Sequence, residues 1–208
     1  MNDIKYKIGG GVMKIREESD LPKHITYNEY QSLLNETENY EYTNYLDKKK
    51  IPRLKARDKL LVQFAWELGG RISDIINIRT RDIDFREKII TVIVKKRHGF
   101  INKVPVSDDL LLSASLYMST YQNNIPGRLF LISRQRAWKI IHVHGMRLGM
   151  ELHPHMFRHG LAIYLLQHGV SEKIIARRLG HSSAATTIKY YMVITPEIER
   201  EALRGVLL

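Results

Sequence analysis

Hydrophobic residues recur every three or four positions along most of the chain, which is the spacing that one buried face of an α-helix requires. In the stretch LKARDKLLVQFAWELGG, the apolar residues from Leu60 to Leu68 would share such a face, and Gly69 would end the helix. The segment RISDIINI then predicts a short helix. Further helices are predicted at 108–122, 134–149, 155–168, 171–179 and 183–192, with a last one from Pro196.

Cap and turn signals divide the first quarter of the chain. Residues 1–20 are polar and include three consecutive glycines, so they predict an irregular leader. A helix is predicted to begin at Thr26, because Glu29 follows three residues later and would complete a capping box. The polar stretch 38–52, which ends at Pro52, predicts a loop.

Two β-branched stretches interrupt the helical pattern. KIITVIV and INKVPV are separated by KKRHGF, and together they predict a β-hairpin with a His-Gly tip. They lie near residues 80–106, and every later predicted element is a helix. The predicted fold class is therefore α+β, mainly α-helical, with one small antiparallel β-sheet.

Composition narrows the class of partner. The 208 residues include 33 Lys and Arg against 22 Asp and Glu, giving a net charge of +11. Such a basic chain favours a polyanion, and nucleic acid is the first candidate. The absence of cysteine excludes disulfides, a cysteine nucleophile and cysteine-ligated metals. No apolar run approaches the length of a membrane span, and no apolar signal core is present, so we expect a soluble intracellular protein.

Five polar residues form a pattern that could carry chemistry. Arg71 follows the Gly-Gly break, His155 and Arg158 lie three residues apart, and Tyr190 follows His181 by nine residues. The guanidinium group of arginine can bind two phosphate oxygens at once, and imidazoles supply further hydrogen-bond donors. Nearby cations would lower the pKa of a tyrosine hydroxyl. This combination suits attack by tyrosine on a phosphate ester. No carboxylate cluster fit for Mg²⁺ is evident, so we expect no metal and no cofactor.

These residues and their surroundings resemble the tyrosine recombinase (phage integrase) family. GGRISDIINIRTRDID is similar to the family's first arginine box, and HPHMFRHGLAIYLLQHGVSEKIIARRLGHSSAATTIKYY is similar to its second. LPKHITYNEYQSLL is similar to the segment that opens the family's catalytic domain. The resemblance covers about residues 21–200 and implies a tyrosine recombinase catalytic domain over residues 21–208.

The resemblance implies a site-specific DNA recombinase, or integrase, that works without metal or ATP. Arg71 and Arg158 would hold the scissile phosphate of the DNA. His155 would bond a phosphate oxygen and assist proton transfer, and His181 would bond a non-bridging oxygen. Asp74 occupies the family's acidic position after the first arginine and would brace the site.

The nucleophile and the general acid are also implied by the resemblance. Tyr190 would attack and form a 3′-phosphotyrosyl link, although Tyr191 is a neighbouring alternative. A lysine of the hairpin would protonate the departing 5′-hydroxyl. Lys96, next to the turn, is favoured, with Lys95 and Lys103 as alternatives.

The family also implies partners and an assembly. We expect binding to double-stranded DNA, a homotetramer on paired DNA sites with a monomer as the state without DNA, and a cytoplasmic, nucleoid-associated location. Family members usually carry an additional N-terminal core-binding domain. Only residues 1–20 precede the opening segment here, so we expect that domain to be absent.

Three other interpretations compete with this one. The cluster of His153, His155 and His159 invites a metal site, but it lacks a nearby carboxylate, and Arg158 would repel a cation. VSEKIIARRLGHSSAATTIKYY also fits a helix-turn-helix of a DNA-binding regulator, which has no use for Arg71 or the His-x-x-Arg pair. A type IB topoisomerase would use the same nucleophile to relax supercoils.

Overall fold

A computed structural model describes residues 21–42, 47–94, 99–122 and 127–181, together with two short strands, Lys5–Ile8 and Gly11–Lys14. The predicted helices at 183–192 and from Pro196 lie outside the described residues. Within the described part of the chain, no helix is both long enough and apolar enough to cross a lipid bilayer.

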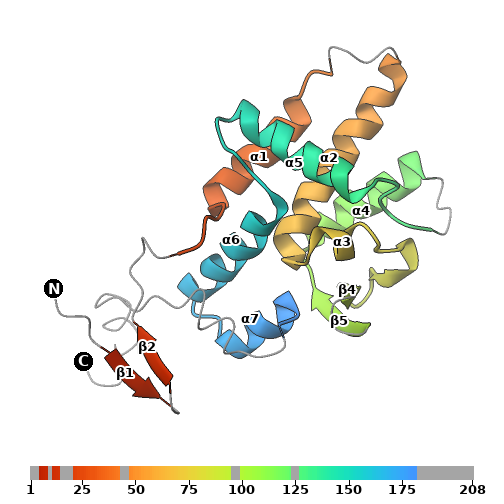
Figure 1. Cartoon of the computed structure of the whole chain (residues 1–208). Coiled ribbons are helices and arrows are strands. Elements are labelled where there is room, and N and C mark those ends of the chain that lie inside the picture. Colours follow the sequence, from red (N-terminus) through yellow and green to blue (C-terminus); the bar gives the residue numbers. More distant parts are fainter. Residues whose placement is uncertain are drawn as a thin grey trace.

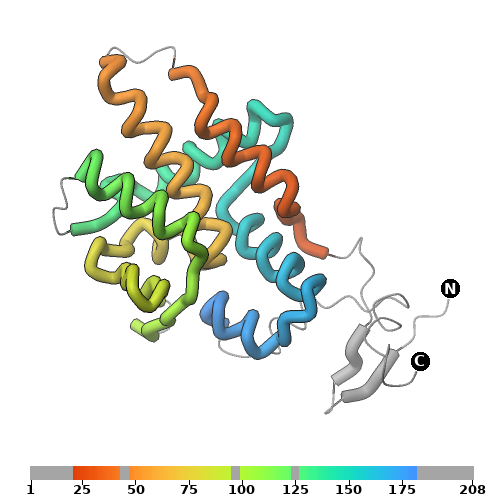
Figure 2. The backbone as a smooth tube through the Cα atoms, turned by 180° about the vertical axis from the view of Figure 1, so that it is seen from behind, coloured from red at the N-terminus to blue at the C-terminus, as the bar shows by residue number. Residues whose placement is uncertain are grey.

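The helical body is organised around α2 (Ile51–Leu68), which contacts α1 (Tyr27–Asn39), α4 (Asp108–Tyr121) and α6 (Pro154–Gln167). Figure 2 shows α1, α2 and α4 side by side. α5 (Arg134–Arg147) packs on α1 and α2 from another side (Figure 1). The predicted apolar face of α2 is confirmed, because Leu60, Leu61 and Phe64 are buried in the core.

Side chains just before the helices fix where they begin. The capping box predicted at Thr26 is confirmed: the Glu29 amide donates to Thr26 Oγ1 at 3.2 Å, and the Thr26 amide donates to Glu29 Oε2 at 2.7 Å. Ser107 and Ser133 cap α4 and α5 with the side chain alone, which accepts from the amides of Leu110 and Arg136. Each such cap satisfies an amide that the helix leaves unpaired and contributes about 1 kcal/mol.

The predicted hairpin is confirmed as part of a three-stranded antiparallel sheet with the order β3 (Ile83–Asp84), β4 (Ile89–Val94), β5 (Phe100–Pro105). Val92 of β4 pairs with Asn102 of β5, and both are buried. Alternate residues of the two strands face the core, as the period of a strand requires. The predicted tip falls on residues 95–98, which lie outside the described residues.

The C-terminal end of α2 is where the elements that matter for function meet. Gly69 ends α2 with a φ of 55°, in the left-handed region that favours glycine. A Cβ at Gly69 would lie 2.5 Å from Leu179 Cδ2 and 2.8 Å from Leu161 Cδ2, so a larger residue would displace both leucine side chains. Figure 1 shows α3 (Ile72–Ile75), the β4–β5 hairpin and α7 (Glu172–Leu179) gathered around this end.

Two sequence-based expectations for the first 52 residues need correction. The leader expected to be irregular contains an antiparallel pair, β1 (Lys5–Ile8) and β2 (Gly11–Lys14), in which Ile8 pairs with Gly11. The expected loop at 38–52 is shorter, because α2 begins at Ile51 with proline in its first turn.

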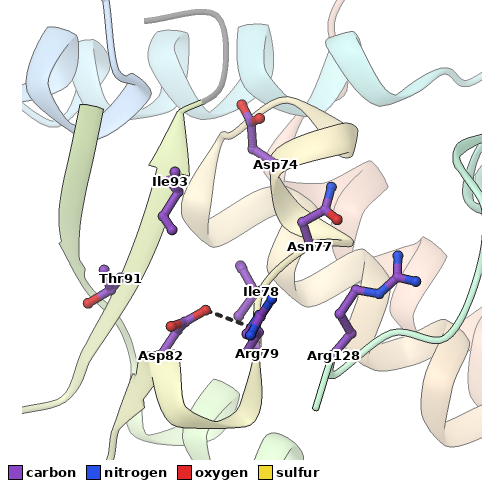
Figure 3. Close-up of a pocket in the computed structure, with 8 residues that line it drawn as sticks. All are labelled: Asp74, Asn77, Ile78, Arg79, Asp82, Thr91, Ile93 and Arg128. Carbon is purple, nitrogen blue, oxygen red and sulfur yellow. Dashed lines mark hydrogen bonds between the residues drawn. The ribbon is translucent and has the colours of Figure 1, made fainter. Parts of the chain in front are cut away.

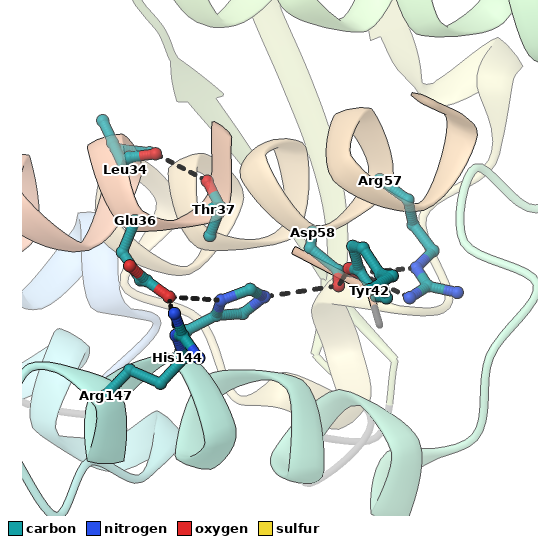
Figure 4. A network of polar contacts seen from close by, with 8 residues as sticks. All are labelled: Leu34, Glu36, Thr37, Tyr42, Arg57, Asp58, His144 and Arg147. Atoms are coloured by element: carbon teal, nitrogen blue, oxygen red, sulfur yellow. Dashed lines mark hydrogen bonds and ion pairs between the residues drawn. The ribbon is translucent and has the colours of Figure 1, made fainter. Parts of the chain in front are cut away.

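A buried polar network ties α1, α2 and α5 together (Figure 4). Asp58 of α2 is only 2% exposed and accepts from Tyr42 Oη at 2.5 Å and from Arg57 Nε at 2.7 Å. His144 of α5 places Nε2 3.4 Å from the same carboxylate and Nδ1 3.9 Å from Glu36 Oε1. Burial and the charge of Asp58 raise the pKa of Tyr42, so its hydroxyl remains a donor.

We expect Asp58→Leu to lower the free energy of unfolding by about 3–5 kcal/mol, because it strands the buried partners of the carboxylate. Urea denaturation at pH 7 measures this change. Asp108→Ala is the matched control: it removes the exposed pair that Lys88 Nζ makes with Asp108 Oδ1 at 2.8 Å, and should cost less than about 1 kcal/mol. Equal losses in the two variants would contradict the network's role.

Candidate active site

Arg71 and Asp74 are placed by the start of α3. Arg71 is the residue before the helix, and its carbonyl accepts from the amides of Asp74 and Ile75 at 2.8 and 3.1 Å. The side chain of Arg71 is half-buried, whereas Asp74 is 4% exposed. The helix start therefore keeps the guanidinium and the carboxylate one turn apart on the same element.

His155 and Arg158 are placed by the first turns of α6. His155 follows Pro154 and is exposed, whereas Arg158, one turn later, is 5% exposed. Arg158 Nη1 donates to the carbonyls of Gly69 at 2.9 Å and of Leu179 at 2.6 Å. The carbonyls at a helix C-terminus have no partner within the helix, so this guanidinium joins the ends of α2 and α7.

His181 is placed by the end of α7. Gly180 ends the helix with a φ of 68°, and the His181 amide closes the turn by donating to the Ala176 carbonyl at 2.8 Å. A Cβ at Gly180 would lie 3.3 Å from Val94 Cγ2. The last residue of β4 thus packs beside the segment that carries His181.

These elements converge on a hollow of about 340 Å³ between α3, α5 and α6. Arg71 and His155 both line it, next to Arg134 and the exposed indole of Trp138. Arg71 also lines a narrower pocket together with Asp74, Leu179 and residues of the hairpin. The structure therefore brings together five residues singled out in the sequence: Arg71, Asp74, His155, Arg158 and His181.

The remaining candidates lie elsewhere in the chain. Tyr190, its neighbour Tyr191, Lys95 and Lys96 lie outside the described residues. Lys103 is exposed on β5, where it pairs with Thr91 of β4.

The electrostatic environment of this site is positive. Partial burial, followed by the charges of Arg158 and Arg71, lowers the pKa of His181 to about 4. Burial and the nearby His155 and Arg158 lower the pKa of His159 to about 4 as well. Both imidazoles are therefore neutral at pH 7, and each has one N–H to donate. A cluster of cations that repels further protons is suited to binding an anion.

These depressed pKa values predict an acid-sensitive fold. Between about pH 6.5 and pH 4 the unfolded chain takes up protons on these histidines and the folded chain does not, so the free energy of unfolding falls as the pH falls. Allowing for their partial exposure, we expect a loss of about 1–2 kcal/mol for each. Urea denaturation of wild type and of the His159→Gln/His181→Asn double variant measures the difference.

The double variant should lose less stability than wild type between pH 7 and pH 4.5. Above about pH 7.5 the two proteins should show the same slope, because both imidazoles are then almost entirely neutral in the folded and the unfolded state. If the free energy of unfolding falls equally in the two proteins between pH 7 and pH 4.5, the lowered pKa values of His159 and His181 are contradicted.

A second hollow, of about 380 Å³, lies on the other side of α3 against the outer face of β4 (Figure 3). Arg79 and Arg128, which are exposed, line it and are joined by an antiparallel backbone bridge. The Arg79 amide donates to Asp82 Oδ2 at 2.8 Å. Asp74 lines this second hollow and also the narrow pocket that Arg71 lines. Arginine side chains therefore line a cavity on each side of α3.

Sequence reasoning missed several residues of this region. The ring of Trp138 is 44% exposed and stacks on His142 with ring centroids 4.6 Å apart. Arg134, Trp138 and His142 recur at four-residue intervals, and this basic and aromatic face of α5 could have been found in the sequence. Arg178 gave no such signal, because it follows Arg177 and looks like a second surface arginine.

The competing metal interpretation finds no support among the described residues, where no group of three or more histidine, aspartate or glutamate side chains could hold an ion. The rings of His155 and His159 lie 6.3 Å apart, centroid to centroid. The second helix of the helix-turn-helix interpretation lies outside the described residues.

Comparison with solved structures defines the class of the fold. The crystal structure of XerA recombinase superposes with a TM-score of 0.69 at 20% identity, covering 93% of this chain and 66% of that one. The catalytic domain of bacteriophage HP1 integrase gives a TM-score of 0.60 at 20% identity, covering 89% of this chain and 95% of that one. The fold is that of a tyrosine recombinase catalytic domain, as the sequence predicted.

Sequence comparison then gives the family. The model of the phage integrase family matches residues 23–196, and the chain belongs to this family. Tyrosine recombinase XerA of Pyrococcus horikoshii is 28% identical over 191 residues, which cover 88% of this chain and 61% of the relative. Tyrosine recombinase XerD of Mycobacterium tuberculosis is 28% identical over 199 residues, covering 89% and 61%. The chain thus spans about three fifths of the length of these relatives.

Proposed function

We propose that residues 21–208 form the catalytic domain of a site-specific DNA recombinase that breaks and rejoins strands through a covalent link to Tyr190. The observation that carries this proposal is the convergence of Arg71, His155, Arg158 and His181, from separate elements, on one positively charged site. Relatives named tyrosine recombinases support it.

The scissile phosphate of the DNA would bind where the cations gather. Arg71 and His155 face the open hollow, and Arg71 and Arg158 are the arginines that depress the pKa of His181. A phosphate placed there would accept from guanidinium forks and from the neutral imidazole of His181, the donor state that pH 7 leaves it in. These donors would stabilise the extra negative charge of the pentacoordinate transition state, because they are held in place before the reaction.

The chemical step is an exchange of phosphate esters. The Tyr190 oxygen forms a bond to phosphorus as the bond from phosphorus to the 5′-oxygen breaks, giving a 3′-phosphotyrosine and a 5′-hydroxyl. His155 assists removal of the tyrosine proton, and Lys96, or Lys95, gives a proton to the departing 5′-oxygen. A second 5′-hydroxyl then attacks the phosphotyrosine and releases Tyr190. One phosphate ester replaces another at each step, so no ATP is needed, and the guanidinium and imidazole donors would stabilise the transition-state charge without a metal.

The hairpin lysines and Asp74 have supporting evidence in the fold. Lys95 and Lys96 follow Val94 directly in the sequence, and Val94 packs against Gly180 next to His181. Asp74 is buried one turn from Arg71 and lines the same narrow pocket, a placement that suits a bracing carboxylate.

Double-stranded DNA is the proposed partner, and its backbone would extend beyond the scissile phosphate. Arg134 and Trp138 lie beside Arg71, and Arg79 and Arg128 line the hollow beyond α3. Two proteins of similar fold have been solved with DNA: XerH site-specific recombinase with its difH substrate, and Tn1549 integrase with transposon right end DNA. We propose further that the protein acts in the cytoplasm, associated with the nucleoid, as a homotetramer on paired sites.

Covalent capture tests this function. The protein is incubated with a pool of randomised duplexes that carry a nick, so that a cleaved short strand diffuses away and the covalent product accumulates. We expect a protein–DNA band on a denaturing gel, unchanged by a chelator, and sequencing of the linked strands should define the site. Two duplexes carrying that site should then exchange strands. A folded protein that yields no covalent band would contradict the proposal.

A further inference from the structure

Arg178 is bound in an unusual way for one of two adjacent arginines at the end of a surface helix. Its neighbour Arg177 is exposed, whereas Arg178 is half-buried, and this burial lowers the pKa of its guanidinium. Nε and Nη2 of Arg178 donate to the Glu67 carbonyl at 2.9 and 2.6 Å, and Nη1 donates to the Pro105 carbonyl at 3.1 Å. A single side chain of α7 therefore holds the main chain of both α2 and β5.

The main chain of Arg178 is held as well. Asn102 of β5 is 4% exposed, and its Nδ2 donates to the Arg178 carbonyl at 3.0 Å. The next carbonyl along, that of Leu179, accepts from Arg158 Nη1 at 2.6 Å. Asn102 of the sheet and Arg158 of α6 thus bind two successive carbonyls of the main chain that leads into His181.

Arg178 and Arg158 both bind main-chain carbonyls at the C-terminal end of α2. The last carbonyls of α2 lack partners within the helix and carry the negative end of its dipole. Arg178 satisfies Glu67 and Arg158 satisfies Gly69, two residues further on. The Glu67 carboxylate is occupied in turn by the amide and hydroxyl of Ser107, at 2.9 and 2.5 Å, which fixes the start of α4 to the same point.

We propose that Arg178 and Asn102, with the carbonyls that they bind, form a latch that positions Leu179 to His181 and Arg158 for DNA cleavage. In this role both are positioning residues, because they reach the DNA only through Arg158 and His181. The latch also connects β5, and through it the hairpin of the candidate lysines, to the phosphate site. The expected effect on DNA cleavage rests on the proposed function. The expected effect on the turn that carries His181 rests on the described contacts alone.

The structural consequence is tested by hydrogen exchange. The Gly180 and His181 amides, which donate to Arg177 and Ala176, report on the turn that carries His181. We expect Arg178→Met and Asn102→Leu to speed their exchange about tenfold or more relative to amides in the middle of α1. Arg177→Met, which removes the same charge from the adjacent exposed position, should leave both rates as in wild type. Unchanged exchange in the latch variants would overturn the proposal, whether or not the protein cleaves DNA.

The catalytic consequence is tested by single-turnover cleavage of a nicked duplex taken from the covalent-capture pool, at saturating protein and well below the melting temperature. We expect Arg178→Met and Asn102→Leu to cleave about tenfold or more slowly than Arg177→Met, with the affinity for DNA changed less than about threefold. The double latch variant should be no slower than the slower single variant, because Arg178 through its side chain and Asn102 through the Arg178 carbonyl hold the same turn. A merely stabilising role would leave these rates unchanged in the folded protein.

The outcomes separate the latch from the proposed function. Faster exchange with cleavage within twofold of Arg177→Met overturns the latch while the recombinase function stands. Absence of a covalent band from wild type itself defeats the proposed function, and with it the latch's catalytic role. If Arg178→Met does not fold, Asn102→Asp replaces it, since its carboxylate would face the Arg178 carbonyl without a donor and should slow cleavage in the same way.

Discussion

Tyr190→Phe is expected to bind DNA as wild type does and to form no covalent adduct. The substitution removes only the hydroxyl that would bond to phosphorus, and a phenyl ring has no atom that can replace it. The contacts of Arg71, Arg158 and His181 with a phosphate would remain, so the affinity should change little. A gel-shift titration under native conditions and the denaturing covalent-capture gel, run on the same samples, measure the two properties separately.

Tyr191→Phe is the matched control, because it removes the same group one residue later. It should retain the covalent band at close to the wild-type rate. A band that persists in Tyr190→Phe and is lost in Tyr191→Phe would show that the nucleophile is Tyr191. If both single variants keep the covalent band, neither Tyr190 nor Tyr191 is required as the nucleophile.

Arg71→Ala and Arg158→Ala are both expected to slow cleavage by about 10²–10³-fold, as loss of a transition-state donor does elsewhere. Their effects on stability should differ. Arg158 is buried, and its loss leaves the Gly69 and Leu179 carbonyls without a donor, at a cost of about 1–3 kcal/mol for each group. Arg71 is half-buried before a helix, so its removal should cost less than about 1 kcal/mol.

Urea denaturation and single-turnover cleavage of the same preparations test this pair of expectations. Arg177→Ala is the control for loss of a nearby exposed charge, and it should change neither quantity by much. Near-normal cleavage by folded Arg71→Ala would exclude it from the phosphate site. A stable, folded Arg158→Ala would contradict the structural function of its buried guanidinium.

The difference between these two arginines illustrates what the sequence could not reveal. Both stand in motifs that resemble the family's arginine boxes, and the resemblance implies one role for both. The contacts of Arg158 join residues 89 and 21 positions away in the chain, and those of Arg178 reach residues 111 and 73 positions away. No local pattern distinguishes Arg178 from Arg177, because burial of either one depends on what packs against α7.

The sequence alone determined the elements and the order of the candidate residues. Helical periodicity, the Thr26 cap, the alternation in β4 and β5 and the Gly69 stop act over a few residues, so they can be recognised in the linear chain. Only the tertiary structure decided which carbonyls hold Arg158 and Arg178, that Trp138 lies beside Arg71, and that partial burial among cations keeps His181 neutral. Those properties depend on which surfaces are brought into contact and withdrawn from water, and that is set by the packing of α6 on α2, of α7 on α6, and of α7 on β5.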